Sequence, residues 1–179
     1  MGALTLTMGN TGPVTAGASV ARDLPSLYDE HYRSLVKLAS FYVDDVETAE
    51  EVVQDAFVKL LGGRYRIETG KEAPYLRSVV LNGARSALRK RRVRRNKQPE
   101  PPGLVAAAEE HGVGRIERDR MLALVKGLPA KQASVLVLRY YLDLSEREIA
   151  DTLGIAPGSV KSHAHRGLAK LKLALEGER

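Results

Sequence analysis

Apolar residues recur every three or four positions in several separate stretches of the chain, which is the spacing of one face of an α-helix. Short polar or glycine-containing segments separate these stretches. The pattern therefore predicts an all-α protein with helices over residues 24–43, 48–61, 74–92, 116–126, 129–141, 146–153 and 157–175.

The last two stretches carry the most specific local signals. Ser145 precedes an apolar run and Glu148 follows three residues later, which is the capping-box pattern of a helix start. Gly154 suits the left-handed conformation that ends many helices, and Pro157 suits the first turn of the next one. Two helices joined by a tight turn with glycine predict a helix-turn-helix.

The helix expected over 48–61 has a wide apolar stripe and a polar side. Thr48 and Glu51 match a second capping box, and the pair Gly62-Gly63 ends the pattern. The polar side carries Glu50, Gln54, Asp55 and Lys59. An ordinary amphipathic helix with a solvated face explains this pattern without any binding partner.

Periodicity is lost in two places, and these divide the chain into domains. Residues 1–22 are rich in Gly, Ala, Thr and Ser, so we expect a disordered tail, within which Met8 is a second candidate start. Residues 96–114 contain three prolines and an alanine run, and they are expected to form a flexible linker. The prediction is thus two small helical domains, 23–95 and 115–179.

The charges are unevenly distributed along the chain. The net charge is +6, but residues 85–97 hold eight cationic side chains and no acidic one, whereas residues 23–62 hold nine acidic and three basic ones. Such a division indicates two kinds of partner, one anionic, such as nucleic acid, and one basic. The dense arginines on one side of the 74–92 helix favour binding of a phosphate backbone.

The helix expected from Pro157 presents a second polar surface. Ser162 and Arg166 point away from its apolar stripe, and the other polar residues near them or on the flanks include Ser159, Lys161, His163 and His165. Small polar and cationic groups on such a face suit the base edges and phosphates of a DNA major groove. A solvated helix face is the alternative explanation.

Composition limits the other classes of function. The chain has no cysteine, which excludes disulfides and thiol chemistry and fits a cytoplasmic location. No apolar run approaches a membrane span, and the first residues make a poor signal peptide. No carboxylate or histidine cluster suggests metal-dependent hydrolysis, so we expect no enzyme, metal or cofactor.

Two blocks of sequence resemble the extracytoplasmic-function (ECF) class of the bacterial sigma-70 family of RNA polymerase sigma factors. One is AEEVVQDAFVKLL followed, after a loop, by YLRSVVLNGARSALRKRR, which is similar to conserved regions 2.2 to 2.4. The other is LPAKQASVLVLRYYLDLSEREIADTLGIAPGSVKSHAHRGLAKLKLAL, which is similar to region 4. The likeness covers about residues 24–95 and 115–175. The linker is too short for a region 3 domain and nothing resembles region 1.1, as is typical of this class.

This resemblance implies a monomer that binds core RNA polymerase, recognises promoter −35 and −10 elements and melts DNA to start transcription of a dedicated regulon. Glu50, Gln54 and Asp55 match the surface that holds the β′ coiled coil of the polymerase. The residues implied at the −10 element are Tyr75, Ser78, Asn82, Arg85, Arg89 and Arg92. Those implied at the −35 element are Ser159, Lys161, Ser162, His163, His165 and Arg166. Further implied partners are the β subunit and an anti-sigma factor.

The chain departs from the family pattern at a few of these positions. Tyr75 stands where the family often has Trp, Ser86 where it often has Asp, and His163-Ala164 where Arg and Leu are more usual. The promoter sequence is therefore not predictable from these residues. A LuxR-type regulator, which binds DNA without polymerase, is an alternative for the helix-turn-helix alone. A nuclease is a weaker alternative, because no partner set accompanies the Asp or His residues.

Overall fold

The computed structural model describes residues 16–62, 67–97 and 112–177, and the regular elements among them are all helical. They are α1 (Ala16–Ser40), α2 (Val46–Leu61), α3 (Glu72–Lys97), α4 (Gly112–Gly127), α5 (Ala130–Leu136), the π-helix η1 (Val137–Tyr141), α6 (Glu146–Leu153) and α7 (Pro157–Glu176). The all-α prediction is confirmed. Residues 1–15 of the expected tail and 98–111 of the expected linker lie outside the described residues.

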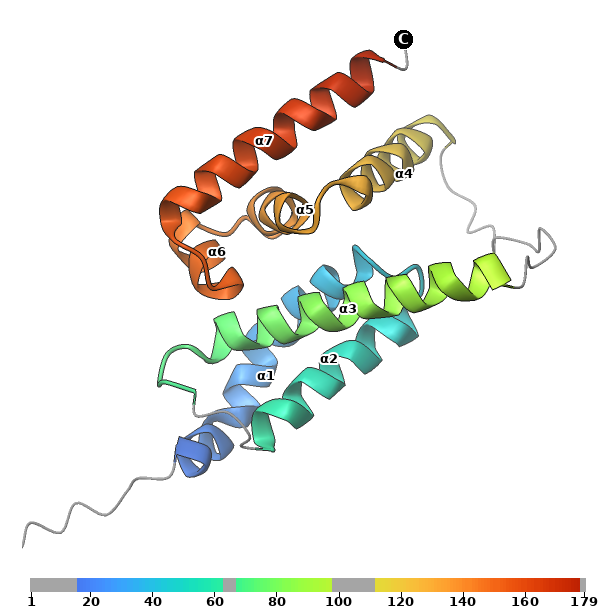
Figure 1. The fold of residues 1–179 in the computed structure, drawn as a ribbon. Helices are drawn as coiled ribbons and strands as arrows, with labels where there is room; N and C mark the ends of the chain where they lie inside the picture. The colour runs from blue at the N-terminus through green and yellow to red at the C-terminus, as the bar shows by residue number, and fades with distance from the viewer. Residues whose placement is uncertain (1–15, 63–66, 98–111, 178–179) are drawn as a thin grey trace, which may run out of the picture.

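The first three helices form one bundle, with α3 packed against both α1 and α2 (Figure 1). Its core side chains come from the apolar stripes that the sequence displays, and the fully buried ones include Leu35, Leu38, Val53, Leu76 and Val80. Each helix thus buries its apolar side in the bundle and turns its polar side outward.

The remaining helices form a second bundle, in which α7 packs against α5 and α6. Fully buried aliphatic side chains at its centre include Val135, Leu138, Ile149 and Val160. The predicted helix-turn-helix is present as α6, a turn at Gly154 with φ 61° and ψ 42°, and α7 with Pro157 in its first turn. The predicted capping box is also confirmed, because Ser145 and Glu148 each bond the backbone N–H of the other.

Several local predictions were wrong. α1 begins at Ala16, so residues 16–22 are helical rather than part of a tail, which fits the high helix propensity of the three alanines in that segment. Helix α2 begins earlier than Thr48, because Asp45 is its N-cap and accepts a hydrogen bond from the Thr48 backbone N–H. An aspartate three residues earlier therefore supplies the cap that we assigned to Thr48.

Two features of the second bundle differ from the simple periodic pattern. Residues 129–141 do not form one regular helix, because the chain widens into the π-helix η1 after α5. On α7, Leu168 lies at helical spacing from the buried Val160, Ala164 and Leu171, which would favour burial. It is nevertheless 45% exposed, and the neighbouring Gly167 is buried instead. A Cβ at Gly167 would lie 3.0 Å from Leu136 Cδ1, so glycine allows α7 and α5 to approach closely there.

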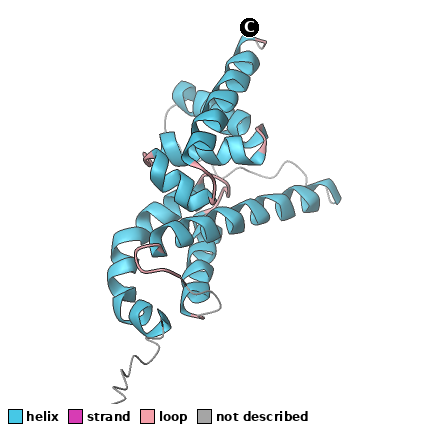
Figure 2. Ribbon diagram, turned by 60° about the vertical axis from the view of Figure 1, so that its left-hand side comes forward, coloured by secondary structure: helices cyan, strands magenta, loops and turns pink. Residues whose placement is uncertain are grey.

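The two bundles also pack against each other. Helix α3 contacts α6, and α1 contacts η1, so that α3 lies between the first two helices and the second bundle (Figures 1 and 2). The sequence predicted two domains on a linker but no contact between them, since residues that are far apart in the chain leave no shared periodic signal.

Candidate binding surfaces

The polar side of α2 faces solvent. Gln54 and Asp55 are exposed and Glu50 is half-buried, while the buried side of the helix holds Ala49 and Val53. Two apolar side chains, Val58 (65% exposed) and Leu61 (48% exposed), also lie on the outer side of α2. This mixture of acidic, amide and aliphatic groups can bind a partner through both charge and apolar contact.

The six residues predicted on α3 do not share one open surface. Asn82, Arg89 and Arg92 are exposed, whereas Tyr75, Ser78 and Arg85 are half-buried. Tyr75 is partly buried and packs against the hydrophobic core. Arg89 donates a hydrogen bond from Nη2 to the Ser86 hydroxyl at 3.0 Å, so its guanidinium lies along the helix surface.

Arg85 is drawn into the contact between the bundles. Its Nη1 donates to the Ser134 hydroxyl of α5 at 3.1 Å, and Ser134 in turn donates to the Ala130 carbonyl at 2.8 Å. The guanidinium carbon also lies 6.0 Å from the centre of the Tyr42 ring. Burial raises the pKa of the Tyr42 phenol to about 12, although the nearby Arg85 charge acts in the opposite direction.

The six residues predicted on α7 form a mostly exposed polar surface. Lys161, Ser162, His165 and Arg166 are exposed, and Ser159 and His163 are half-buried. Two hydrogen bonds within α7 orient side chains on this surface. The Ser162 hydroxyl donates to the Gly158 carbonyl and Arg166 Nε donates to the Ser162 carbonyl, each at 3.2 Å. This surface suits the groove-facing side of a recognition helix.

His163 and Lys161 stand apart from the rest of this set. The Nδ1 atom of His163 is buried and has no hydrogen-bond partner among the described residues. Lys161 Nζ lies 3.6 Å from a carboxylate oxygen of Glu146 on α6, so its charge is partly balanced within the helix-turn-helix. Arg166, His165 and Ser162 are therefore the residues most available to a ligand on α7.

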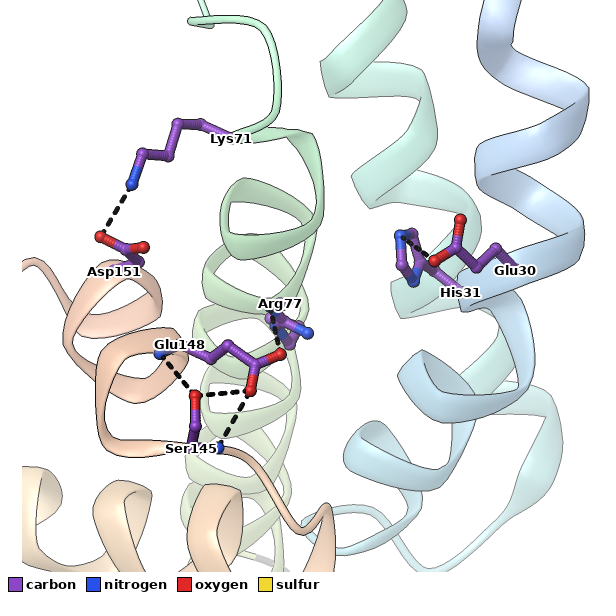
Figure 3. A network of polar contacts seen from close by, with 7 residues as sticks. All are labelled: Glu30, His31, Lys71, Arg77, Ser145, Glu148 and Asp151. Atoms are coloured by element: carbon purple, nitrogen blue, oxygen red, sulfur yellow. Dashed lines mark hydrogen bonds and ion pairs between the residues drawn. The ribbon is translucent and has the colours of Figure 1, made fainter.

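Two charged pairs that the sequence did not predict join α6 to Arg77 of α3 and to Lys71, the residue just before α3 (Figure 3). Lys71 Nζ lies 2.8 Å from Asp151 Oδ1, and Arg77 Nη2 lies 3.9 Å from Glu148 Oε1. Partial burial lowers the pKa of the Arg77 guanidinium, against the opposing effect of the Glu148 and Asp151 charges. No sequence signal marks these pairs, because each joins residues that are far apart in the chain.

The described residues hold neither a candidate metal site nor a helix that could span a membrane. They contain no group of three or more His, Cys, Asp or Glu side chains arranged to hold a metal ion. None of the described helices is both long enough and apolar enough to cross a membrane.

Comparison with known proteins identifies both bundles. Residues 27–94 match the family described as sigma-70 region 2, and residues 118–171 match sigma-70, region 4. The chain is 33% identical over 153 residues to the RNA polymerase sigma-E factor of Streptomyces coelicolor, covering 81% of this chain and 84% of that protein. It is 28% identical over 167 residues to the ECF RNA polymerase sigma factor SigL of Mycobacterium tuberculosis, covering 90% and 93%.

The fold also matches a solved structure. The sigma factor RpoE of Bartonella quintana, in complex with the anti-sigma factor NepR, superposes with a TM-score of 0.61. The alignment has 21% identity and covers 88% of this chain and 99% of that one. At this identity the likeness supports the arrangement of helices alone.

Proposed function

The chain belongs to the ECF class of the sigma-70 family of RNA polymerase sigma factors, and from this premise we propose which of its surfaces meets each partner. As a sigma factor it is a transcription-initiation protein and not an enzyme. We assign the polar side of α2 to core RNA polymerase, α3 to the −10 element and α7 to the −35 element. We also propose that the protein melts promoter DNA and starts transcription of a dedicated regulon.

The assignment of α2 rests on exposure and charge. Gln54 and Asp55 project from a helix whose opposite side is fully packed, so they are available without any rearrangement. The surrounding acidic character of residues 23–62 suits a basic partner, such as the β′ coiled coil that the family resemblance implies. We propose that the β subunit of the polymerase is a second partner of the protein.

The assignment of α3 rests on the cationic character of that helix. Asn82, Arg89 and Arg92 are exposed on its outer side, and residues 85–97 carry eight positive charges without an acidic one. Arginines attract the phosphate backbone, while Asn82 and Tyr75 can contact unstacked bases. Unstacking a base costs a few kcal/mol, which these contacts would offset.

The assignment of α7 rests on the exposed residues of the recognition helix. Arg166, His165 and Ser162 lie on the side away from α5 and α6, where a major groove can accept them. A LuxR-type regulator would use such a helix too, but the match of residues 27–94 to sigma-70 region 2 leaves that alternative without support.

One combined observation carries the proposal. The bundle that matches sigma-70 region 2 has the acidic outer side of α2 and the cationic side of α3, and the bundle that matches region 4 has the exposed polar side of α7. Because core polymerase and the chromosome share the cytoplasm, we place the protein there. We also propose an anti-sigma factor as a partner, supported by the Bartonella relative, whose structure contains one.

Co-elution with core RNA polymerase tests the assignment of α2. The wild-type protein is compared with Gln54→Ala/Asp55→Ala and with a control, Lys172→Ala/Glu176→Ala, which removes an exposed ion pair of 3.8 Å near the end of α7. We expect a complex for wild type and control and its loss in the first variant. An undiminished complex of the Gln54/Asp55 variant would move the polymerase contact away from this side of α2.

A further inference from the structure

The start of α6 brings together two cations that come from other elements. Arg139 of η1 donates a hydrogen bond from Nη1 to Glu146 Oε1 at 3.3 Å, and Lys161 Nζ of α7 lies 3.6 Å from Glu146 Oε2. Glu146 is the first residue of α6, so its carboxylate connects η1, α6 and α7. We call Arg139, Glu146 and Lys161 the Glu146 triad. It adjoins the surface that we assign to the −35 element, because Lys161 belongs to both.

The triad is accessible to solvent. The Lys161 side chain is 71% exposed, and those of Arg139 and Glu146 are 35% and 33% exposed. An anion in solution can therefore approach all three charges. The single carboxylate balances only one of the two cations, so the triad keeps an excess of positive charge and would attract a phosphate group more strongly without Glu146.

The π-helix η1 holds Arg139 in its place beside the carboxylate. The Leu142 backbone N–H donates to the Val137 carbonyl at 3.2 Å, which is the i+5 bond of a π-helix. The guanidinium carbon of Arg139 lies 5.9 Å from the centre of the Tyr140 ring, which is itself 62% exposed. The backbone and a neighbouring ring thus orient Arg139 toward the start of α6.

The position of the triad within the helix-turn-helix determines what it would meet on DNA. In this motif the second helix lies in the major groove and the first helix crosses the sugar-phosphate backbone. If α7 reads the −35 element, we expect the start of α6 to lie near phosphates. Phosphate contacts raise the affinity for every sequence, whereas contacts with base edges distinguish one sequence from another.

We propose that Glu146 is a specificity-determining residue of the −35 surface, because its carboxylate restrains Arg139 and Lys161 from binding phosphates of any sequence. Discrimination then depends more on Ser162 and Arg166, which are exposed one turn apart on α7. A carboxylate beside a DNA-binding surface weakens unwanted binding more than wanted binding, which is a general route to specificity. The inference rests on the proposed assignment of α7, and it adds a residue outside the recognition helix that tunes that site.

The first experiment measures binding without sequence preference. The full-length protein, in which Lys161, Ser162 and Arg166 are exposed, is titrated into a short labelled duplex of mixed sequence, and fluorescence anisotropy is recorded at several salt concentrations. Glu146→Gln keeps the size of the side chain and removes its charge. We expect this variant to bind about three- to tenfold more tightly than wild type, with a salt dependence steeper by about one phosphate contact.

The matched control is Glu117→Gln, which removes one negative charge from an exposed position of α4 in the same bundle. Because surface charges beyond a screening length act weakly, this variant should differ from wild type by less than about twofold in affinity. Equal affinities of Glu146→Gln and Glu117→Gln would overturn the inference. Damage to α6 would weaken binding, so tighter binding by Glu146→Gln is not the result expected of a merely structural residue.

A second set of variants tests whether Glu146 acts through its two cations. In the background Arg139→Ala/Lys161→Ala, the groups that the carboxylate restrains are absent. The gain in affinity caused by Glu146→Gln should therefore fall below about twofold in this background. A gain as large as in the wild-type background would overturn the role of the triad.

The second experiment measures sequence discrimination. Core RNA polymerase loaded with each protein selects from a pool of duplexes with a randomised upstream region, and the bound DNA is sequenced. Wild type and Glu117→Gln should enrich the same upstream pattern equally, and Glu146→Gln should enrich that pattern less strongly. The pattern itself should persist, because Ser162 and Arg166 are unchanged. Equal enrichment by wild type and Glu146→Gln would contradict the inference.

A further variant separates this inference from the proposed function. Ser162→Ala/Arg166→Ala alters exposed residues of α7 outside the triad. Loss of the upstream pattern in this variant, together with equal behaviour of Glu146→Gln and Glu117→Gln, would overturn the role of Glu146 alone. An upstream pattern as strong as that of wild type would overturn the assignment of α7 to the −35 element, and the inference with it.

Discussion

The carboxylate of Glu148 accepts two hydrogen bonds from Ser145, one from its backbone N–H at 2.9 Å and one from its hydroxyl at 2.8 Å. The other carboxylate oxygen, Oε1, faces Arg77 of α3 at 3.9 Å. These hydrogen bonds, and to a smaller extent Arg77, lower the pKa of Glu148. One glutamate therefore both completes the start of α6 and takes part in the contact between the bundles.

Replacing Ser145 tests the capping box. Ser145→Ala removes the side chain that accepts from the Glu148 backbone N–H at 3.3 Å, and it should lower the free energy of unfolding by about 1 kcal/mol. Urea denaturation followed by circular dichroism measures this loss. Ser145→Asn keeps an uncharged acceptor at the N-cap and should retain most of the stability. Equal stability of Ser145→Ala and wild type would mean that the cap contributes nothing.

Asp45 gives a prediction with a pH dependence. Its hydrogen bond with Thr48 lowers the pKa of the Asp45 carboxyl below its usual value, so the charged form stabilises the folded state. This contribution is fully present above the unfolded pKa and is lost as pH falls through the lower, folded pKa. Asp45→Ala should lower the free energy of unfolding by about 1 kcal/mol at pH 7. Below about pH 4 the free energies of unfolding of this variant and the wild type should approach each other.

The control for Asp45 is Asp45→Asn, which keeps a capping oxygen without a titrating charge. At pH 7 its free energy of unfolding should be close to that of the wild type. The difference in free energy of unfolding between Asp45→Asn and Asp45→Ala should stay constant as the pH is lowered. A cost of Asp45→Ala that is constant between pH 7 and pH 3 would argue against the role of the carboxylate charge. Denaturation midpoints at each pH provide the measurement.

Two glycines of α7 should respond in opposite directions to alanine. A Cβ at Gly167 would meet Leu136 Cδ1 at 3.0 Å and Leu136 Cγ at 3.3 Å, and Leu136 is buried and has little room to move. Gly167→Ala should therefore destabilise the protein by about 1 kcal/mol despite its better helix propensity. Nothing lies within 4 Å of a Cβ at Gly158, so Gly158→Ala should stabilise it by up to about 1 kcal/mol. Stabilisation by both substitutions would show that Leu136 can yield.

Arg166 tests how α7 recognises DNA. The residue is exposed, and its Nε is held by the Ser162 carbonyl, which leaves the end of the guanidinium free to reach a base. Arg166→Ala should weaken transcription selectively according to −35 sequence, by ~1–3 kcal/mol if the contact is bidentate to a base. In-vitro transcription from a set of promoters that vary at −35 measures the effect. A loss equal on all of them would make Arg166 a phosphate contact instead.

The parts of the fold that the sequence predicted well are those governed by neighbouring residues. Helix periodicity, the Ser145 capping box, the left-handed Gly154 and the first-turn Pro157 each depend on groups within a few positions of one another. The errors arose where two local signals competed. Asp45 and Thr48 are both good N-caps, and α2 uses the earlier one.

For the candidate surfaces, the amino-acid sequence alone determined which helix sides are polar, acidic or cationic, because that depends only on residue type and the helical period. Only the tertiary structure decided which of these groups remain free. It turned Arg85 toward Ser134, set Lys71 against Asp151 and widened the end of α5 so that Tyr141 meets Phe41. Such contacts join residues that are distant along the chain, and they depend on how two completed bundles fit together, which no local pattern encodes.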